Sequence, residues 1–167
     1  NISDAYRRAG KLEQAMAAIQ PVADKGDRKA KVKLAELWLE KGDKGKSYEL
    51  YDELIAENKQ DIQTYLSRAD NSMRRQEYPQ AAADYKMALR LIPDDEANSA
   101  LRRRIAGELA AAYINLDQPT QAVAVLQPYI ANRTATKNME GNYILALRNS
   151  RQARLAVYMA GLLWPKL

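Results

Sequence analysis

Two ten-residue stretches of this chain resemble each other: QAMAAIQPVA at residues 14–23 and QAVAVLQPYI at residues 121–130. A chain that repeats itself usually stacks one structural unit several times, so the period of the repeat constrains the fold most. Small residues equivalent to Ala15 recur at Ser47, Ala81 and Ala122, at spacings of 32, 34 and 41 residues. These spacings lie near the roughly 34-residue length of a repeat made of two helices and a turn. Small side chains are expected where paired helices come closest to each other.

The composition favours helices throughout the chain. Cys, His and Phe are absent, and only seven Gly and six Pro occur. Ala, Leu, Lys, Arg, Glu and Gln, which favour helix, are frequent. Hydrophobic residues make up 47% and charged residues 28% of the 167 residues, as in ordinary globular proteins. The length suits one domain or one array of repeats, and no apolar stretch is as long as a membrane span.

The clearest repeat unit runs over residues 62–95, IQTYLSRADNSMRRQEYPQAAADYKMALRLIPDD. It reads as two helices with a turn at RQEY. Pro93 disfavours helix at Ile92, and Asp94 or Asp95 is expected to cap the helix that follows.

This unit resembles a tetratricopeptide repeat, and Arg68 is its one departure, because that family has Leu there. The matching positions are Tyr65, Ala69, Ala81, Tyr85, Ala88 and Pro93. The pattern extends over residues 28–61, where EKGDKGKSYELY also resembles the Sel1-like branch, and over 96–136. Residues 1–27, with Tyr6, Gly10, Ala15 and Ile19, give a partial repeat, and residues 137–167 give a degenerate or truncated one. The resemblance implies an all-α fold, a right-handed α-solenoid of about four to five tandem antiparallel helix pairs.

Three local features add expectations about individual helices. Pro21 and Pro128 each lie six residues after a packing alanine, and each is expected to stop or kink its helix early. The seven extra residues of the unit 96–136 are expected to lengthen its first helix. Ser150 is expected to cap a last helix over residues 151–163.

The residue types exclude most catalytic chemistry. Without His or Cys the chain has no imidazole base, no thiol nucleophile and no His- or Cys-ligated metal site. Glu36 and Glu40 share one helix face, but charged residues at this spacing usually form a solvated face. KGDKGKS lacks the spacing of a phosphate-binding loop. The sequence therefore predicts a protein that is not an enzyme and has no cofactor or metal.

The chain is basic, with a net charge of +5 and a pI of about 9.3. Basic residues cluster at Arg7–Arg8 with Lys11, at 25–33, at 102–104 and at 148–154. Acidic residues are interleaved with most of these clusters and no stacking aromatics accompany the arginine triplet, which disfavours nucleic acid as a partner. An acidic protein partner or simple solubility explains the same charge.

The resemblance implies a groove lined by the first helix of each repeat. Its expected partner-binding residues are Lys29, Lys33, Glu36, Leu39, Glu40, Gln63, Leu66, Asp70, Met73, Arg74, Arg104, Glu108, Ile114 and Asn115. Leu39, Met73 and Ile114 share one offset and would form an apolar row suited to a peptide or an amphipathic helix. The alternative is that these three residues only support neighbouring repeats. Glu36, Asp70 and Ala111 stand where the carboxylate-clamping members of the family have Asn, which disfavours a C-terminal carboxylate as the partner in this groove.

The predicted last helix is apolar on most sides, whereas an array should end in a helix with a polar outer face. We therefore expect further repeats after it or a covering partner, and self-association through this helix. The predicted function is a non-catalytic scaffold that docks a partner protein or peptide. The alternative is a periplasmic segment of a bacterial exopolysaccharide export or envelope-assembly protein that contacts glycan. The composition and the start at Asn1 favour the bacterial periplasm after removal of a leader, with the cytoplasm left open.

Overall fold

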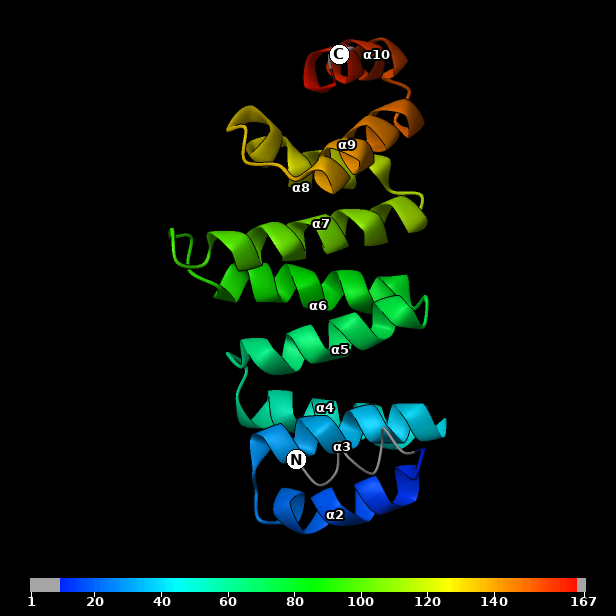
Figure 1. The fold of residues 1–167 in the computed structure, drawn as a ribbon, viewed down its shortest axis with the longest axis vertical. Coiled ribbons are helices and arrows are strands. Elements are labelled where there is room, and N and C mark those ends of the chain that lie inside the picture. The colour runs from blue at the N-terminus through cyan, green and yellow to red at the C-terminus, as the bar shows by residue number, and fades with distance from the viewer. Residues whose placement is uncertain (1–9, 165–167) are drawn as a thin grey trace. The chain divides into compact units, whose positions relative to one another are not determined.

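The computed structural model describes residues 10–164, which form nine α-helices and no strand. The described chain divides into two compact units, residues up to Asn71 and residues from Ser72 onward, and each is described by itself. Within each unit, successive helices run back and forth beside one another (Figure 1). The expected all-α fold of tandem antiparallel helix pairs is confirmed. Tyr6 and the Arg7–Arg8 cluster lie outside the described residues.

Unit 1 is built around a helix that is buried on two sides. Its helices are α2 (Leu12–Asp24), α3 (Arg28–Lys41), α4 (Lys44–Glu57) and α5 (Ile62–Arg74). The last three residues of α5 belong to unit 2. One side of α3 places Leu34 and Leu37 in a cluster with residues of α2. Another side places Ala35 and Leu39 in a cluster with Tyr51 of α4. Because α3 buries two sides, only a narrow stripe of it remains open.

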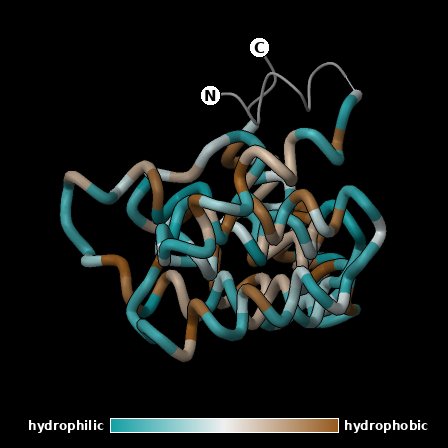
Figure 2. Tube along the Cα trace, turned by 90° about the horizontal axis from the view of Figure 1, so that it is seen from below, coloured by the Kyte–Doolittle hydropathy of each residue, from teal (hydrophilic) through white to brown (hydrophobic). Residues whose placement is uncertain are grey.

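Unit 2 has one continuous core. Its helices are α6 (Tyr78–Leu91), α7 (Ser99–Asn115), α8 (Pro119–Ala131), α9 (Lys137–Asn149) and α10 (Ala153–Leu163). The core includes Ala110, Leu126, Met139, Leu147 and Ala156, contributed by four successive helices. Hydrophobic and hydrophilic positions alternate along the helices, as expected of amphipathic helices (Figure 2).

The turn inside each helix pair repeats the same backbone geometry. Gly42, Gln76, Asp117 and Arg151 each have a positive φ and are spaced by 34, 41 and 34 residues. In every one of these turns the next amide donates to the carbonyl five residues earlier, over 2.8–2.9 Å. This bond satisfies a carbonyl at the end of the first helix. The period expected from the sequence is therefore present in the backbone itself.

The small residues that set the period are all buried. Ala15, Ser47, Ala81 and Ala122 have no exposed surface. The next position of the series, Ala156, is 1% exposed and packs in the core of unit 2. Each lies on the second helix of a pair, where a close approach of helices leaves no room for a larger side chain.

The longest repeat differs from the expectation in how it takes up its extra residues. α7 has 17 residues whereas α5 has 13, so the helix does lengthen. The remaining extra residues form the non-helical segment 92–98 between α6 and α7. As expected, α6 ends before Pro93, with Ile92 in an extended conformation. The capping prediction is wrong for the helix, because Asp95 accepts the amide of Asn98 in the preceding turn, over 2.9 Å.

Two other local expectations differ from the structure. α2 and α8 do not stop at Pro21 and Pro128, since each helix continues for three further residues. The early stop is therefore wrong, and the alternative of a kink stays a prediction. Both prolines lie on exposed faces, where water can replace the backbone bond that proline lacks. Ser150 does not cap the last helix. It ends α9 instead, donating its hydroxyl to the carbonyl of Leu147 over 3.1 Å, and α10 begins only at Ala153.

Candidate functional site

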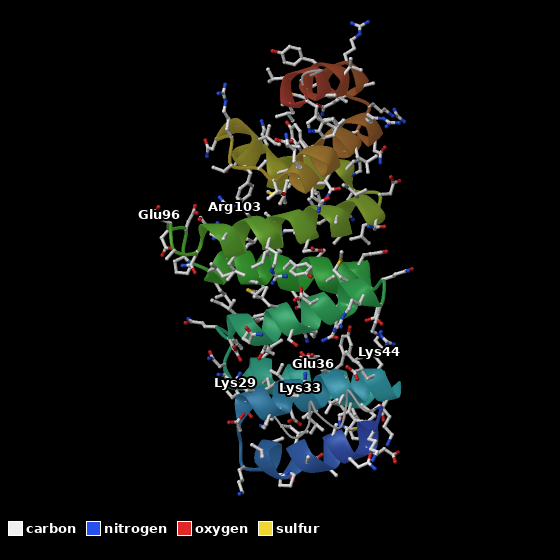
Figure 3. The ribbon with its side chains drawn as sticks, in the orientation of Figure 1. Lys29, Lys33, Glu36, Lys44, Glu96 and Arg103 are labelled. Atoms are coloured by element: carbon white, nitrogen blue, oxygen red, sulfur yellow. The ribbon has the colours of Figure 1, made fainter. Side chains whose placement is uncertain are left out.

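A cleft of about 350 Å³ lies in unit 1 between the first helices of two successive pairs, α3 and α5. It is lined by Arg28, Lys29, Val32, Lys33, Glu36 and Gln63. Three of the predicted binding residues, Lys29, Lys33 and Glu36, thus come together at one place, and Figure 3 shows them along the same helix. Gln63, which the resemblance also placed in the groove, supplies the opposite wall.

The helical period explains why α3 presents these residues. Lys29, Lys33, Glu36 and Glu40 are separated by four, three and four positions, so they form one stripe along the helix. This stripe lies between the two faces that α3 buries against α2 and α4. Val32, which is 9% exposed, gives the cleft an apolar floor beside the stripe.

Glu36 is held in place by neighbours on two helices. Its Oε2 lies 3.2 Å from the Nζ of Lys33, and its Oε1 accepts the hydroxyl of Ser67 over 2.9 Å. Ser67 Oγ lies 3.0 Å from the buried hydroxyl of Tyr51, which also accepts Nδ2 of Asn71 over 3.0 Å. This polar network joins α3, α4 and α5, so the Glu36 carboxylate is a fixed part of the wall.

Arg28 closes one end of the cleft. Its guanidinium donates to Asp61 over 2.6 Å, to Glu57 over 2.8 Å and to the carbonyl of Leu54 over 2.8 Å. Partial burial acts to raise the pKa of Asp61, but hydrogen bonds from Thr64 and Arg28 and the charge of Arg28 outweigh it, so this pKa is lowered. The charge of Arg28 is therefore balanced by the carboxylates of Glu57 and Asp61.

Lys29 is the cation of the cleft whose charge is not balanced. It is exposed, and it makes no hydrogen bond or ion pair with the described part of the chain, residues 10–164. Lys33 faces Glu36, and Arg28 faces Glu57 and Asp61. The cleft thus combines an apolar floor, fixed polar walls and one available ammonium group.

Unit 2 has a cleft at the equivalent position of later repeats, between α7 and α9. Its volume is about 380 Å³, and it brings together the predicted residues Arg104 and Glu108 with Asn138. These three residues lie at the repeat positions that Lys29, Lys33 and Gln63 occupy in unit 1. Asn138 was not among the predicted residues, although the repeat period that located the other positions leads to it.

Leu39 and Leu66 do not line either cleft. Leu39 is 6% exposed and packs in the core cluster of Val32, Ala35, Tyr51 and Leu54. Its expected place as an open groove anchor is wrong, because it packs inside its own repeat, residues 28–61. The alternative, support of a neighbouring repeat, stays a prediction. Leu66 is likewise only 6% exposed.

The remaining predicted residues lie outside the two clefts. Glu40, Arg74 and Asn115 are exposed, and Asp70, Met73 and Ile114 are half-buried. Ile114 packs against the core of unit 2, and Asn115 donates Nδ2 to the carbonyl of Ala111 over 2.8 Å. The expected apolar row takes Leu39 from unit 1 and both Met73 and Ile114 from unit 2. A partner-binding role for Met73 and Ile114 therefore stays a prediction.

Residues 10–164 contain neither a cluster of metal ligands nor a helix suited to spanning a membrane. No group of three or more Asp, Glu, His or Cys side chains in this range could hold a metal ion. No helix in the same range is both long and apolar enough to cross a bilayer.

Comparisons with known proteins identify the fold. No protein-family model matches the sequence. No curated protein sequence matches it either. Among solved structures, one of MamA has a TM-score of 0.71 and 16% identity, covering 95% of this chain and 90% of that one. A Podosopora anserina putative kinesin light chain with nearly identical TPR-like repeats has a TM-score of 0.67 and 15% identity, covering 94% and 87%.

Sequence identities this low establish similarity of fold alone. They agree with the helix pairs, the repeating turns and the buried small residues, while the Sel1-like character remains a prediction. The chain has a tetratricopeptide-like helical-repeat fold.

Proposed function

We propose that this chain is a non-catalytic scaffold that docks an acidic segment of a partner protein in the cleft between α3 and α5. Folds of this tetratricopeptide-like kind are generally protein-interaction modules. The observation that carries the proposal is the charge of the cleft: Lys29 is exposed and has no partner among residues 10–164, whereas Arg28 and Lys33 each face carboxylates. An acidic side chain of the partner would pair with Lys29, so that each of the three cations would face a carboxylate.

The geometry favours an extended segment over a small ligand. The stripe of Lys29, Lys33, Glu36 and Glu40 runs along most of α3, so successive side chains of a peptide can meet successive positions. Apolar contact with Val32 would supply affinity, and the charges would set orientation and association rate. The equivalent cleft of Arg104 and Glu108 in unit 2 offers a second site of related chemistry.

The test compares two charge reversals of equal size. A partner captured from a lysate with the parent protein would be purified and titrated against Lys29→Glu and Lys59→Glu. Lys59 is also exposed, but it lies in the turn before α5 and does not line the cleft. We expect Lys29→Glu to weaken binding by at least about tenfold and Lys59→Glu to leave it nearly unchanged. Equal affinities for the two variants would remove the cleft as the docking site.

The glycan alternative rests on composition alone. It remains a hypothesis that the chain contacts polysaccharide in the periplasm during export or envelope assembly. Titration with envelope oligosaccharides separates the two functions, because a glycan scaffold would show saturable shifts of amides in α3 and α5 without any protein partner. Absence of such shifts at millimolar sugar would count against this alternative.

A further inference from the structure

Unit 2 contains a cavity that the proposed docking function does not use. It has a volume of about 420 Å³ and lies between the N-terminal half of α7 and the C-terminal half of α8. Apolar side chains of Leu89, Ala106 and Val125 line part of it. These three residues belong to the core of unit 2 or pack against it, so this wall is held rigidly. The volume is within the usual range for sites that hold small molecules.

Two neighbouring arginines line this cavity and differ in their partners. Arg102 donates to the carbonyls of Leu89 and Ile92 over 3.0 and 2.6 Å and lies 3.1 Å from Asp94. Arg103 makes no hydrogen bond or ion pair within the described range 10–164, although it is half-buried. Figure 3 marks Arg103 on α7 near the loop that carries Glu96. Its donors are therefore available to an anion, and partial exclusion of water strengthens such a pairing.

Three further polar side chains of the cavity are available, whereas the hydroxyl of Thr134 in the same lining donates to the carbonyl of Tyr129 over 3.4 Å. Ser99, Tyr129 and Asn132 line it, and the side chain of none of them bonds to the described residues, 10–164. Each can donate a hydrogen bond. Asp94 is the one carboxylate in the lining, and Arg102 already neutralises it. The cavity therefore offers four donor side chains around an apolar wall and an excess of positive charge.

From this arrangement we infer that the cavity between α7 and α8 binds a small organic carboxylate, an acid with an apolar body. Arg103 receives the carboxylate through its two-pronged guanidinium, and Ser99, Tyr129 or Asn132 completes its hydrogen bonds. The apolar body lies against Leu89 and Val125, which are partly exposed in the lining. The inference is independent of docking in the α3–α5 cleft, which belongs to unit 1 and shares no residue with this cavity. The α7–α9 cleft of unit 2 shares Arg103 with it.

The experiment uses benzoate as the probe, with benzamide as its uncharged match and inorganic phosphate as an anion without an apolar body. Binding is followed by methyl NMR of Ala106 and Val125 in the whole chain. Arg103→Gln removes the proposed partner, and Arg148→Gln makes the same charge change at an exposed arginine of α9 that lines neither this cavity nor the α7–α9 cleft. Circular dichroism checks that both variants keep the parent's helix content.

We expect benzoate to shift both methyl signals saturably, with Arg103→Gln weakening binding by at least about tenfold and Arg148→Gln changing it little. Equal binding of benzamide and benzoate would overturn the role of Arg103. Phosphate binding as tightly as benzoate would overturn the need for an apolar body. If acetyl-Ala-Phe shifted the methyl signals and benzoate did not, the ligand would be a peptide carboxylate, and a small acid would be ruled out.

Discussion

The turn residues Gly42, Gln76, Asp117 and Arg151 share a left-handed backbone although only one of them is glycine. A residue with a Cβ is strained in this conformation by roughly 1–2 kcal/mol. The strain persists because each turn completes the same hydrogen bond, from the next amide to the carbonyl five residues earlier. Glycine favours this conformation and Asp tolerates it, but Gln76 and Arg151 adopt it although their side chains do not favour it, so at those two turns helix packing outweighs local preference.

Gly42 and Gly45 give a matched pair for measuring this strain. A Cβ added at Gly42 has open space around it, so Gly42→Ala would cost only the backbone strain, about 1 kcal/mol of unfolding free energy. Gly45 lies inside α4, and an added Cβ there meets only Asp43 Oδ1 at 3.6 Å. Gly45→Ala should therefore stabilise the protein by about 0.4–1 kcal/mol. Urea unfolding measures both, and a shift of the same sign in the two variants would contradict the strain argument.

At the scale of whole helices, one ionic contact joins three helix ends in unit 1. Arg28 at the start of α3 reaches the carbonyl of Leu54 near the end of α4 and the carboxylate of Asp61, just before α5. Asp61 also accepts the hydroxyl of Thr64 over 2.6 Å. These bonds satisfy polar groups at helix ends, which hydrophobic packing cannot do. They set the positions of the two helices that form the proposed docking cleft.

The lowered pKa of Asp61 gives this contact a pH signature. The carboxylate is stabilised in the folded state, so its contribution is complete above its unfolded pKa, near 3.9, and is lost as pH falls through the lower folded pKa. Asp61→Asn keeps a side chain able to cap α5 but removes the charge. We expect it to cost about 1–3 kcal/mol at pH 7, with the difference from the parent shrinking below about pH 4.

Denaturation midpoints of the parent and Asp61→Asn between pH 2 and pH 7 check this expectation. Glu49→Gln is the control, because Glu49 is exposed and has no hydrogen bond or ion pair within residues 10–164. A stability difference for Asp61→Asn that stayed constant down to pH 2 would show that the charge of Asp61 does not stabilise the fold.

Over the whole molecule, the repeat period was the part of the structure that could be predicted well. It located the buried small residues and the open stripe of α3, because periodicity shows which side of a helix is apolar or polar. Leu39 was misplaced because periodicity does not reveal which neighbour covers an apolar residue. Gln76 and Arg151 gave no sign of a left-handed turn, since their side chains do not favour one. The lack of a partner for Lys29 and Arg103 among residues 10–164 could not be predicted, because pairing depends on residues far away in the sequence.

The last helix bears on how the whole molecule associates. α10 exposes Val157, Tyr158 and Leu162, which are 75%, 65% and 59% accessible. Val123, one repeat earlier, instead packs against the core of unit 2. Adjacent exposed apolar side chains of this size mark a surface that binds another surface. The expected self-association through this helix therefore remains a prediction, with Val157 as the residue that tests it.

Val157→Lys places a charge on this face, and Val22→Lys makes the same change at an exposed valine of α2. Neither should change the unfolding free energy by more than about 0.5 kcal/mol, because both sites are exposed. We expect the parent and Val22→Lys to bind an apolar dye and to increase in mean mass with concentration in light scattering, and Val157→Lys to lose both properties. If the parent stays monomeric at high concentration and binds no dye, α10 is not an association surface. Its apolar side chains would then be the ordinary exposed hydrophobic surface that every folded protein retains.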